Sequence, residues 1–292
     1  MAELVRVGLV SASGIDERVL DRASRLSNGE LSGPAAAPWG MRASVLGEVH
    51  DAAALRRDLR ALSRGTGTDV AVVTGPLATQ PPKLLLMDVD STLINEEVID
   101  ELAHVAGAGP RVAAITEAAM RGELDFREAL AERVSTLAGL PASVFETVAD
   151  RLTLSPGAQS LVDAAHASGA KVAVVSGGFT EVVEILASRV GLDWFEANHL
   201  EVVDAQLTGR TTGDVVDKHA KLTLLHRFAE TAGCRADEVV AIGDGANDLL
   251  MLGAAGLGVA FCAKPVAADA ADASLTFRRL DAVAGFAQLG VR

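Results

Sequence analysis

Two aspartates in the stretch "LLLMDVDSTLINEE" (residues 84–97) are spaced so that their carboxylates could bind a cation and act on a phosphate ester. Asp88 and Asp90 follow four apolar residues and lie two positions apart, so both side chains leave a buried strand toward one small volume. Two carboxylates so close together do not both stay ionised cheaply unless a cation joins them. A lone D-x-D would more simply be a solvated turn, so the interpretation depends on the rest of the chain.

A second acidic cluster, "AIGDGANDLL" (residues 241–250), follows another predicted strand. Asn247 or Asp248 alone would be explained as a helix N-cap. Capping does not explain Asp244 and Asp248 together, whereas oxygen ligands for Mg²⁺ would. We expect Asp88, Asp244 and the backbone carbonyl of Asp90 to bind the ion directly, with Asp248 acting through water.

Two weaker signals complete the set of groups that phosphoryl transfer requires. In "VVSGGF" (residues 174–179), the Ser176 hydroxyl and the N–H groups of Gly177 and Gly178 suit phosphate oxygens, although S-G-G alone is usually a turn. In "DKHAKLTLL" (residues 217–225), Lys218 and Lys221 open a predicted helix, although a lysine is most often a surface charge. Together the clusters predict a carboxylate nucleophile, a divalent ion, a hydroxyl and a lysine, with Asp90 carrying the protons.

The elements that position these groups predict an α/β fold. From Leu84 onward, the strands "LLLMD", "KVAVVS", "EVVAIGD" and "GLGVAF" alternate with helical patterns, which indicates a parallel sheet with its site at the carboxyl ends of the strands. Residues from about 95 to 155 read as helical throughout and predict a lid inserted after the first of these strands.

The first 80 residues differ from the rest. The strands "LVRVGLVS", "MRASVLGEV" and "DVAVVTG" alternate with helices starting near Asp16 and Asp51, which predicts a small α+β module of ferredoxin-like type. We expect "SNGELSGPAAAPWG" (residues 27–40) to be a loop, and "PLATQPPK" to be a linker because of its paired prolines.

Composition limits the partners. The chain has 292 residues, 49% of them hydrophobic, and a formal net charge of −13. That charge argues against nucleic acid and anionic membranes as partners, while a small anionic substrate remains open. Cys234 and Cys262 suit neither a disulfide framework nor a metal site. The apolar run near the N-terminus is too short for the core of a signal peptide, and 18 consecutive apolar residues occur nowhere, so we expect neither a signal peptide nor a membrane-spanning helix. We expect a cytoplasmic protein.

The four motifs in this order resemble the haloacid dehalogenase-like (HAD) phosphohydrolases: D-x-D-S-T, then Ser, Lys and G-D-G-x-N-D. The resemblance implies a Rossmann-like core of residues 81–292, with an all-helical cap at about 95–155. Within that superfamily, "DVDSTLINEEVIDELA", "DFREALAERVSTLAGL" and "GDGANDLLMLGAAGLGVAFCAKP" are similar to the phosphoserine phosphatase family. This implies Mg²⁺-dependent hydrolysis of O-phosphoserine, the last step of serine biosynthesis, through an aspartyl-phosphate.

The resemblance also implies individual roles. Asp88 is the nucleophile, and Asp90 is the general acid and then the base. The phosphoryl group is held by Ser176, Lys221 and Asn247, and the metal by Asp88, Asp90 and Asp244 with support from Asp248. Glu97 pairs with the substrate ammonium and Arg133 with its carboxylate, while Met120, Phe126, Gly177 and Gly178 contact the rest of the substrate.

The N-terminal 80 residues resemble, less closely, an ACT module, an amino-acid-sensing domain of ferredoxin-like fold. "SASGIDERVL" keeps Gly14 and Asp16 but lacks the next glycine usual in that turn, so we do not expect this module to bind a ligand. A role in packing or in a homodimer and a degenerate appendage without a role of its own stay open equally. Two alternatives for the whole chain stay open. One is a phosphatase or phosphotransferase acting on another small phosphomonoester, and the other is an amino-acid sensor without turnover.

Overall fold

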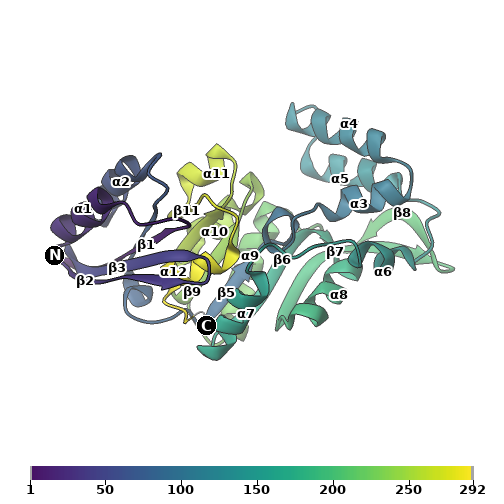
Figure 1. Ribbon diagram of the computed structural model, residues 1–292. Helices are drawn as coiled ribbons and strands as arrows, with labels where there is room; N and C mark the ends of the chain where they lie inside the picture. The colour runs from purple at the N-terminus through teal and green to yellow at the C-terminus, as the bar shows by residue number, and fades with distance from the viewer. Residues whose placement is uncertain (1, 291–292) are drawn as a thin grey trace.

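The computed structural model describes residues 2–290, whose strands form one eleven-stranded sheet in the order β2-β3-β1-β4-β11-β10-β9-β5-β6-β7-β8. Figure 1 shows this sheet running across the whole molecule, with the N-terminal strands at one end and the β7–β8 hairpin at the other. The α/β architecture expected from the sequence is therefore confirmed, and the N-terminal module extends the sheet of the core.

The N-terminal module has the βαββαβ order of a ferredoxin-like fold. Its elements are β1 (Glu3–Ser11), α1 (Glu17–Ser27), β2 (Glu30–Ala37), β3 (Gly40–Val49), α2 (Ala52–Ser63) and β4 (Asp69–Val73). Both helices begin where the sequence indicates, because the Asp16 side chain accepts N–H bonds from Arg18 and Val19, and the Asp51 side chain accepts one from Ala54. All four strands pair antiparallel.

The expectation of a loop at residues 27–40 is wrong. Residues Glu30–Ala37 form β2, an edge strand that pairs with β3. The glycine and proline that suggested a loop lie at an irregularity between Ser32 and Ala35, where the register shifts. An edge strand with a bulge tolerates such residues because the outer backbone groups need no partner strand.

The core follows the predicted alternation. Its parallel strands are β5 (Leu84–Met87), β6 (Lys171–Phe179), β9 (Val239–Gly243) and β10 (Leu257–Phe261). Three further strands were not predicted: β7 (Trp194–Val203), β8 (Gln206–Thr212) and β11 (Ala273–Leu275). β7 begins parallel to β6 and then forms an antiparallel hairpin with β8, while β11 pairs with both β10 and β4 and so joins the core to the N-terminal module.

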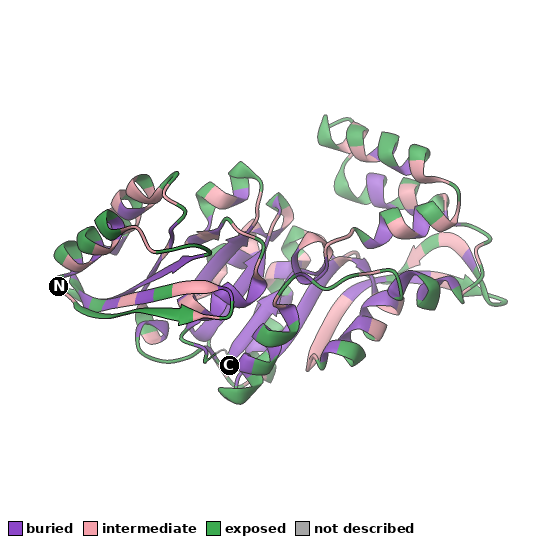
Figure 2. Ribbon diagram, viewed as in Figure 1, coloured by how far each residue is buried: buried purple, intermediate pink, exposed green. Residues whose placement is uncertain are grey.

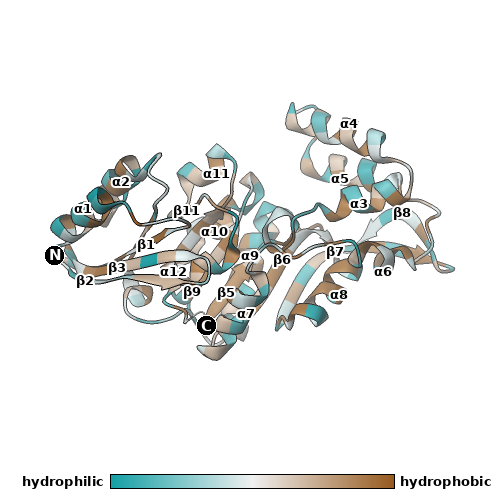
Figure 3. Ribbon diagram, in the orientation of Figure 1, coloured by the Kyte–Doolittle hydropathy of each residue, from teal (hydrophilic) through white to brown (hydrophobic). Residues whose placement is uncertain are grey.

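Helices cover both faces of the core sheet (Figure 1). They are α7 (Ala158–Ala167), α8 (Thr180–Val190), α9 (Lys218–Thr231), α10 (Leu249–Ala254), α11 (Pro265–Ala270) and α12 (Val283–Ala287). Short helical turns are η1 (Gly75–Ala78), η2 (Val89–Leu93), η3 (Ala236–Glu238), η4 (Ala246–Asp248) and η5 (Leu280–Ala282). The central strands β5, β6 and β9 are buried along almost their whole length, which Figure 2 shows in purple, and Figure 3 shows their hydrophobic character in brown.

The helical insertion has two parts: its first three helices stand above the end of the sheet that carries the β7–β8 hairpin, and its last helix packs against α8 of the core (Figure 1). The insertion comprises α3 (Val98–Val105), α4 (Gly109–Met120), α5 (Phe126–Ser135) and α6 (Val144–Ala149). Asp125 and Glu128 form a reciprocal capping box at the start of α5, and α5 packs against β8. The hairpin of β7 and β8 therefore supports the insertion from the core side.

The two faces of the N-terminal sheet have different partners. Val5, Val7 and Leu9 pack with α1 and α2 in a core of their own. The intervening residues of β1 face α12, where a Cβ atom on Gly8 would lie 3.3 Å from backbone atoms of Gly285 and Phe286. Within residues 2–290 the helices are all too short or too polar to cross a membrane.

Candidate active site

The motifs meet at the carboxyl ends of neighbouring strands. Met87 lies beside Val174 of β6 and Ile242 of β9, and the Asp88 N–H continues the ladder by donating to the Ile242 carbonyl at 2.9 Å. Asp88 and Asp244 therefore leave the sheet side by side. The strand pattern predicts this proximity because parallel neighbours end at one edge.

Lys221 is the cation at the centre of this edge. Its ammonium lies 2.7 Å from a carboxylate oxygen of Asp88 and 2.7 Å from one of Asp248, and the three side chains are 5% exposed or less. α9 delivers Lys221 here because Asp217 caps the helix by accepting N–H bonds from His219 and Ala220. By contrast, Lys218, one turn earlier on the same helix, is exposed.

Asp248 holds the loop after β9. One of its carboxylate oxygens accepts N–H bonds from Asp244 at 3.2 Å and Gly245 at 3.0 Å, while the other accepts from Lys221. A Cβ atom at Gly243 would lie 2.5 Å from the Asp248 carboxyl group, so this position requires glycine. Asp248 therefore supports the loop that carries Asp244.

Asp88, Asp244 and Asp248 each offer an oxygen, and these oxygens all lie within 4.8 Å of one another. Burial raises the pKa of Asp88 well above its usual range, with a further rise from Asp248 and an opposing effect of Lys221. Burial and Asp248 likewise raise the pKa of Asp244 to about 6. Asp88 and Asp244 thus resist ionisation while they lie close together. A hard divalent cation bound between them would favour their charged forms, so the cluster suits such an ion.

Asp90 has its own set of partners. One oxygen accepts the Val98 N–H at 2.8 Å, and the other accepts the Ser176 hydroxyl at 3.3 Å. Burial raises the pKa of Asp90 to about 7, and Glu97 adds to the rise. A carboxyl group with this pKa holds a proton for a substantial fraction of the time at neutral pH, so Asp90 can both give and take one.

Ser176 is completely buried, and its hydroxyl oxygen accepts the Gly178 N–H at 2.7 Å. A Cβ atom at Gly178 would lie 2.9 Å from that hydroxyl and 3.0 Å from an Asp90 oxygen. Glycine at 178 therefore allows Ser176 and Asp90 to approach each other.

A cavity of about 460 Å³ lies between these groups and the helical insertion. It brings together the predicted residues Asp88, Asp90, Glu97, Met120, Phe126, Arg133, Gly177, Gly178, Asp244 and Asn247. The remaining predicted residues, Ser176, Lys221 and Asp248, lie buried beneath it. Ser176 contacts Asp90, and Lys221 contacts both Asp88 and Asp248. Every residue to which the family resemblance gives a role in catalysis or binding is thus at the cavity or directly behind it.

The insertion contributes one anion and one cation to the cavity. Glu97 is exposed and accepts the Ser91 hydroxyl at 2.9 Å. Arg133 is partly buried, donates from Nε to the Ala129 carbonyl at 3.2 Å, and makes no ion pair within residues 2–290. Burial lowers the pKa of Arg133, and the nearby acidic groups oppose this. Its terminal nitrogens therefore remain available for a bound anion.

Phe126 and Met120 differ in their surroundings. A Cβ atom at Gly177 would lie 3.5 Å from the Phe126 ring, so the insertion reaches the core there. Met120 is 74% exposed and lies at the rim of the cavity.

Asn198 belongs to the site although no sequence motif indicates it. This side chain is 1% exposed, donates to the Gly177 carbonyl at 2.8 Å and accepts the Val216 N–H at 2.8 Å. It therefore links the Ser-Gly-Gly turn to the segment before α9. A prediction of β7 as a strand parallel to β6 would have placed Asn198 beside the Ser-Gly-Gly turn. Ile99, Thr116 and Lys264 also line the cavity.

Residues 85–253 match the model of the haloacid dehalogenase-like hydrolases. The chain belongs to this family. A phosphoserine phosphatase from Streptomyces coelicolor is 51% identical over 229 residues, or 78% of this chain and 56% of that protein. Another from Streptococcus thermophilus is 56% identical over 63% of this chain and 85% of that protein. The chain thus spans little more than half the length of the Streptomyces relative.

Two solved structures resemble the fold. A HAD family hydrolase from Salmonella enterica serovar Typhi superposes with a TM-score of 0.86 at 28% identity and covers 98% of both chains. This likeness extends through the N-terminal module. A phospho-aspartyl intermediate analogue of phosphoserine phosphatase superposes with a TM-score of 0.64 at 43% identity, covering 69% of this chain and 96% of that one.

Proposed function

We propose that this protein is a Mg²⁺-dependent phosphatase that hydrolyses O-phosphoserine to serine and inorganic phosphate through a phosphorylated Asp88, the last step of serine biosynthesis. The observation that carries the proposal is the pairing of Asp88 with the buried Lys221 at the base of a cavity that Asp90, with its raised pKa, also lines. The names of the relatives from Streptomyces coelicolor and Streptococcus thermophilus support the same substrate.

Asp88, Asp244 and the Asp90 carbonyl would hold Mg²⁺, with Asp248 positioning the loop behind them. This assignment is supported by the cluster of carboxylate oxygens within 4.8 Å of one another. Bound magnesium would neutralise the negative charge of the phosphoryl group and of the carboxylates that face it.

In the first step, an Asp88 oxygen attacks phosphorus, and the bond from phosphorus to the serine oxygen breaks. Asp90 donates its proton to that leaving oxygen, which requires the protonated form that its raised pKa favours. Lys221 and Ser176, with Asn247 at the cavity wall, would hold the phosphoryl oxygens as charge redistributes among them.

In the second step, Asp90 is ionised and takes a proton from a water molecule. The water oxygen attacks phosphorus, and the bond between phosphorus and Asp88 breaks, which releases phosphate and restores the enzyme. The helical insertion would limit the access of bulk water to the first step, because its residues Met120, Phe126 and Arg133 form one wall of the cavity.

The serine part of the substrate carries one positive and one negative group. Glu97 would pair with the ammonium, and Arg133 would bind the carboxylate through the nitrogens that make no ion pair among the described residues. Met120 and Phe126 would cover the substrate, and the backbone of Gly177 and Gly178 would contact it.

The division of the chain is part of this proposal. Residues 1–80 would form the ACT-like domain and residues 81–292 the phosphatase domain, with a cap at about 95–155.

A homodimer through the N-terminal domain is supported by the open edge of β2 and the exposed Leu31 and Leu46 on its strands. Light scattering of the purified chain and of a Leu31→Lys variant tests it: the variant should be monomeric.

Phosphate release from O-phosphoserine with and without Mg²⁺ tests the activity. We expect release that depends on the metal and that exceeds release from phosphothreonine, phosphotyrosine and p-nitrophenyl phosphate. A better rate on another phosphomonoester, or transfer of phosphate to an added alcohol, would assign a different substrate or acceptor. Serine binding without any turnover would identify a sensor and contradict the proposal.

A further inference from the structure

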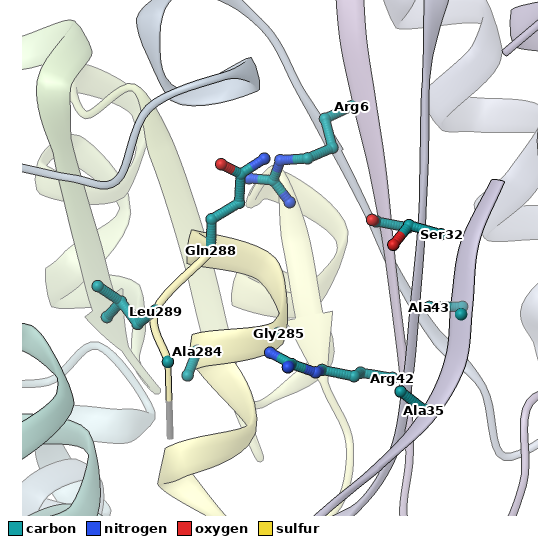
Figure 4. A pocket seen from close by; sticks show the side chains of 12 residues that line it. Arg6, Ser32, Ala35, Arg42, Ala43, Ala284, Gly285, Gln288 and Leu289 are labelled. Atoms are coloured by element: carbon teal, nitrogen blue, oxygen red, sulfur yellow. The ribbon is translucent and has the colours of Figure 1, made fainter. Parts of the chain in front are cut away.

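A second cavity, of about 320 Å³, lies where the N-terminal sheet meets α12, at the opposite end of the core from the helical insertion. It is formed by the face of β1, β2 and β3 that does not carry α1 and α2. Figure 4 shows side chains from these strands on one side and from α12 on the other. Within the sheet, Ser44 of β3 pairs with Gly8 of β1 on one side and with Ser32 of β2 on the other.

Arg6 enters this cavity from β1 and is only 2% exposed. Its Nε donates to the Ala78 carbonyl at 3.2 Å, and its Nη2 donates to the carbonyls of Leu77 and Phe286. These bonds fasten η1 and α12 to the N-terminal sheet. They use Nε and Nη2 alone, and the buried Nη1 has no hydrogen-bond partner within residues 2–290.

The charge of Arg6 also lacks a partner in the described chain. The lining of the cavity contains no aspartate or glutamate, although the chain as a whole is strongly acidic. Burial without a compensating carboxylate lowers the pKa of Arg6 to about 10. A buried guanidinium with an unused N–H group is costly to maintain unless an anion accompanies it.

A second arginine reaches the same space. Arg42 of β3 lies on the Arg6 face of the sheet, since Arg6, Gly8 and Val10 pair with Leu46, Ser44 and Arg42 in turn. Figure 4 shows the Arg42 side chain extending across the cavity toward Gly285. The hydroxyl groups of Ser32 and Ser44 add donors between the two arginines. Two guanidinium groups and two hydroxyls match the acceptor oxygens of a carboxylate or a phosphate.

We infer that this junction cavity is a binding site for a small oxyanion, a carboxylate or a phosphate, held between the Nη1 group of Arg6 and the side chain of Arg42. The site is separate from the cavity that Asp88 lines, and it does not depend on the function proposed above. Because Arg6 also ties η1 and α12 to the N-terminal sheet, a bound anion stabilises the docking of the N-terminal module on the core.

Thermal unfolding with malonate and with sulfate as probes tests the site, and EDTA keeps metal out of the active site. We expect each bound anion to raise Tm by about 3–6 °C at a tenfold excess over its Kd. Malonate and sulfate distinguish a carboxylate site from a tetrahedral-anion site, and the better probe indicates the natural class. No rise with either anion would overturn the inference and leave Arg6 as a structural tie only.

Substitutions in the cavity test whether the anion that raises Tm binds there. Arg42→Ala removes an exposed side chain and should abolish most of the rise in Tm. Ala35→Glu places a carboxylate on the cavity face of β2, so it should raise Tm without any anion and remove the response to malonate. Ala36→Glu is the matched control, because the next residue of the strand points to the opposite face. An anion response that persists in both Arg42→Ala and Ala35→Glu belongs to another site and contradicts the inference.

A crystal soaked in selenate gives a direct check. Anomalous scattering should place selenium beside Arg6 Nη1 in the unmodified chain. Selenium found at the Lys221 site alone would contradict the inference even if Tm had risen.

Discussion

Lys221 and Arg6 are both almost completely buried, at 1% and 2% exposure, but the groups that surround them differ. Lys221 lies between two carboxylates, Asp88 and Asp248, that the chain itself supplies. Arg6 lies among backbone carbonyls, and the cavity beside it contains no acidic side chain. At the catalytic edge the fold provides the countercharges of its buried cation, whereas at the junction of module and core the structure leaves room for a countercharge from solution.

Replacing the nucleophile should have the largest effect. We expect Asp88→Asn to lower kcat on O-phosphoserine by about 10⁴-fold or more, because an amide oxygen is a poor nucleophile toward phosphorus. The fold should persist, since Asp248 still pairs with Lys221. Steady-state kinetics and thermal unfolding measure the two effects. Asp214→Asn, at an exposed position, is the control, and normal turnover in Asp88→Asn would exclude this residue as the nucleophile.

The next largest effect should follow removal of Lys221. Lys221→Met leaves two buried carboxylates without a cation, and we expect it to lower the free energy of unfolding by about 3–5 kcal/mol. The loss should shrink at acid pH, because Asp88, whose pKa burial already raises, then becomes neutral. Urea unfolding at about pH 5 and about pH 8 measures this difference.

Lys218→Met is the matched control for Lys221→Met, on the exposed side of the same helix. Equal stabilities of the two variants would mean that Lys221 and its carboxylates do not act as a unit.

The two regions also differ in how far the sequence could predict them. The catalytic groups follow strands with strong apolar patterns, and parallel strands end together, so Asp88, Asp244 and Ser176 were expected at one edge. The lysine could be chosen only from the family resemblance, because Lys218 and Lys221 are equivalent in the local pattern. Neither pattern nor resemblance indicated Asn198, since β7 is only partly buried and lacks a clear alternation.

At the junction, local patterns carry little information. Arg6 contacts Phe286, 280 positions away, and a charged residue within an apolar strand gives no sign of such a partner. The sequence of β2 predicts a loop because its glycine and proline lie at a bulge, where an edge strand tolerates them. A site formed by chain segments so far apart depends on tertiary packing that the sequence patterns do not specify.

Asp69 permits a smaller test of the junction. It lies at the start of β4, is 7% exposed, and accepts bonds from the N–H and hydroxyl of Thr276. Burial raises its pKa from 3.8 to about 6. The folded state thus binds this proton more tightly than the unfolded state, so the contribution of Asp69 to stability falls as pH rises from 3.8 to about 6.

We expect Asp69→Asn to remove this loss, which amounts to at most about 3 kcal/mol. Urea unfolding across that pH range should therefore show a smaller decline, or a steeper rise, in the variant than in the unmodified chain. Asp21→Asn, on the exposed face of α1, should leave the profile unchanged. Parallel profiles for Asp69→Asn and the unmodified chain would mean that Asp69 titrates normally.

Arg133 can be compared directly with Arg6. Neither arginine makes an ion pair among the described residues, but Arg133 lines the catalytic cavity. If its partner is the carboxylate of the substrate, Arg133→Ala should raise KM for O-phosphoserine by about 10- to 100-fold, the value of a charge-assisted hydrogen bond. KM for p-nitrophenyl phosphate, which has no carboxylate, should change by less than about twofold. Arg111→Ala, on the exposed side of α4, should alter neither value. Equal increases for both substrates in Arg133→Ala would instead indicate that this arginine supports the helical insertion, so that Arg133 would have a structural role and no anion to bind.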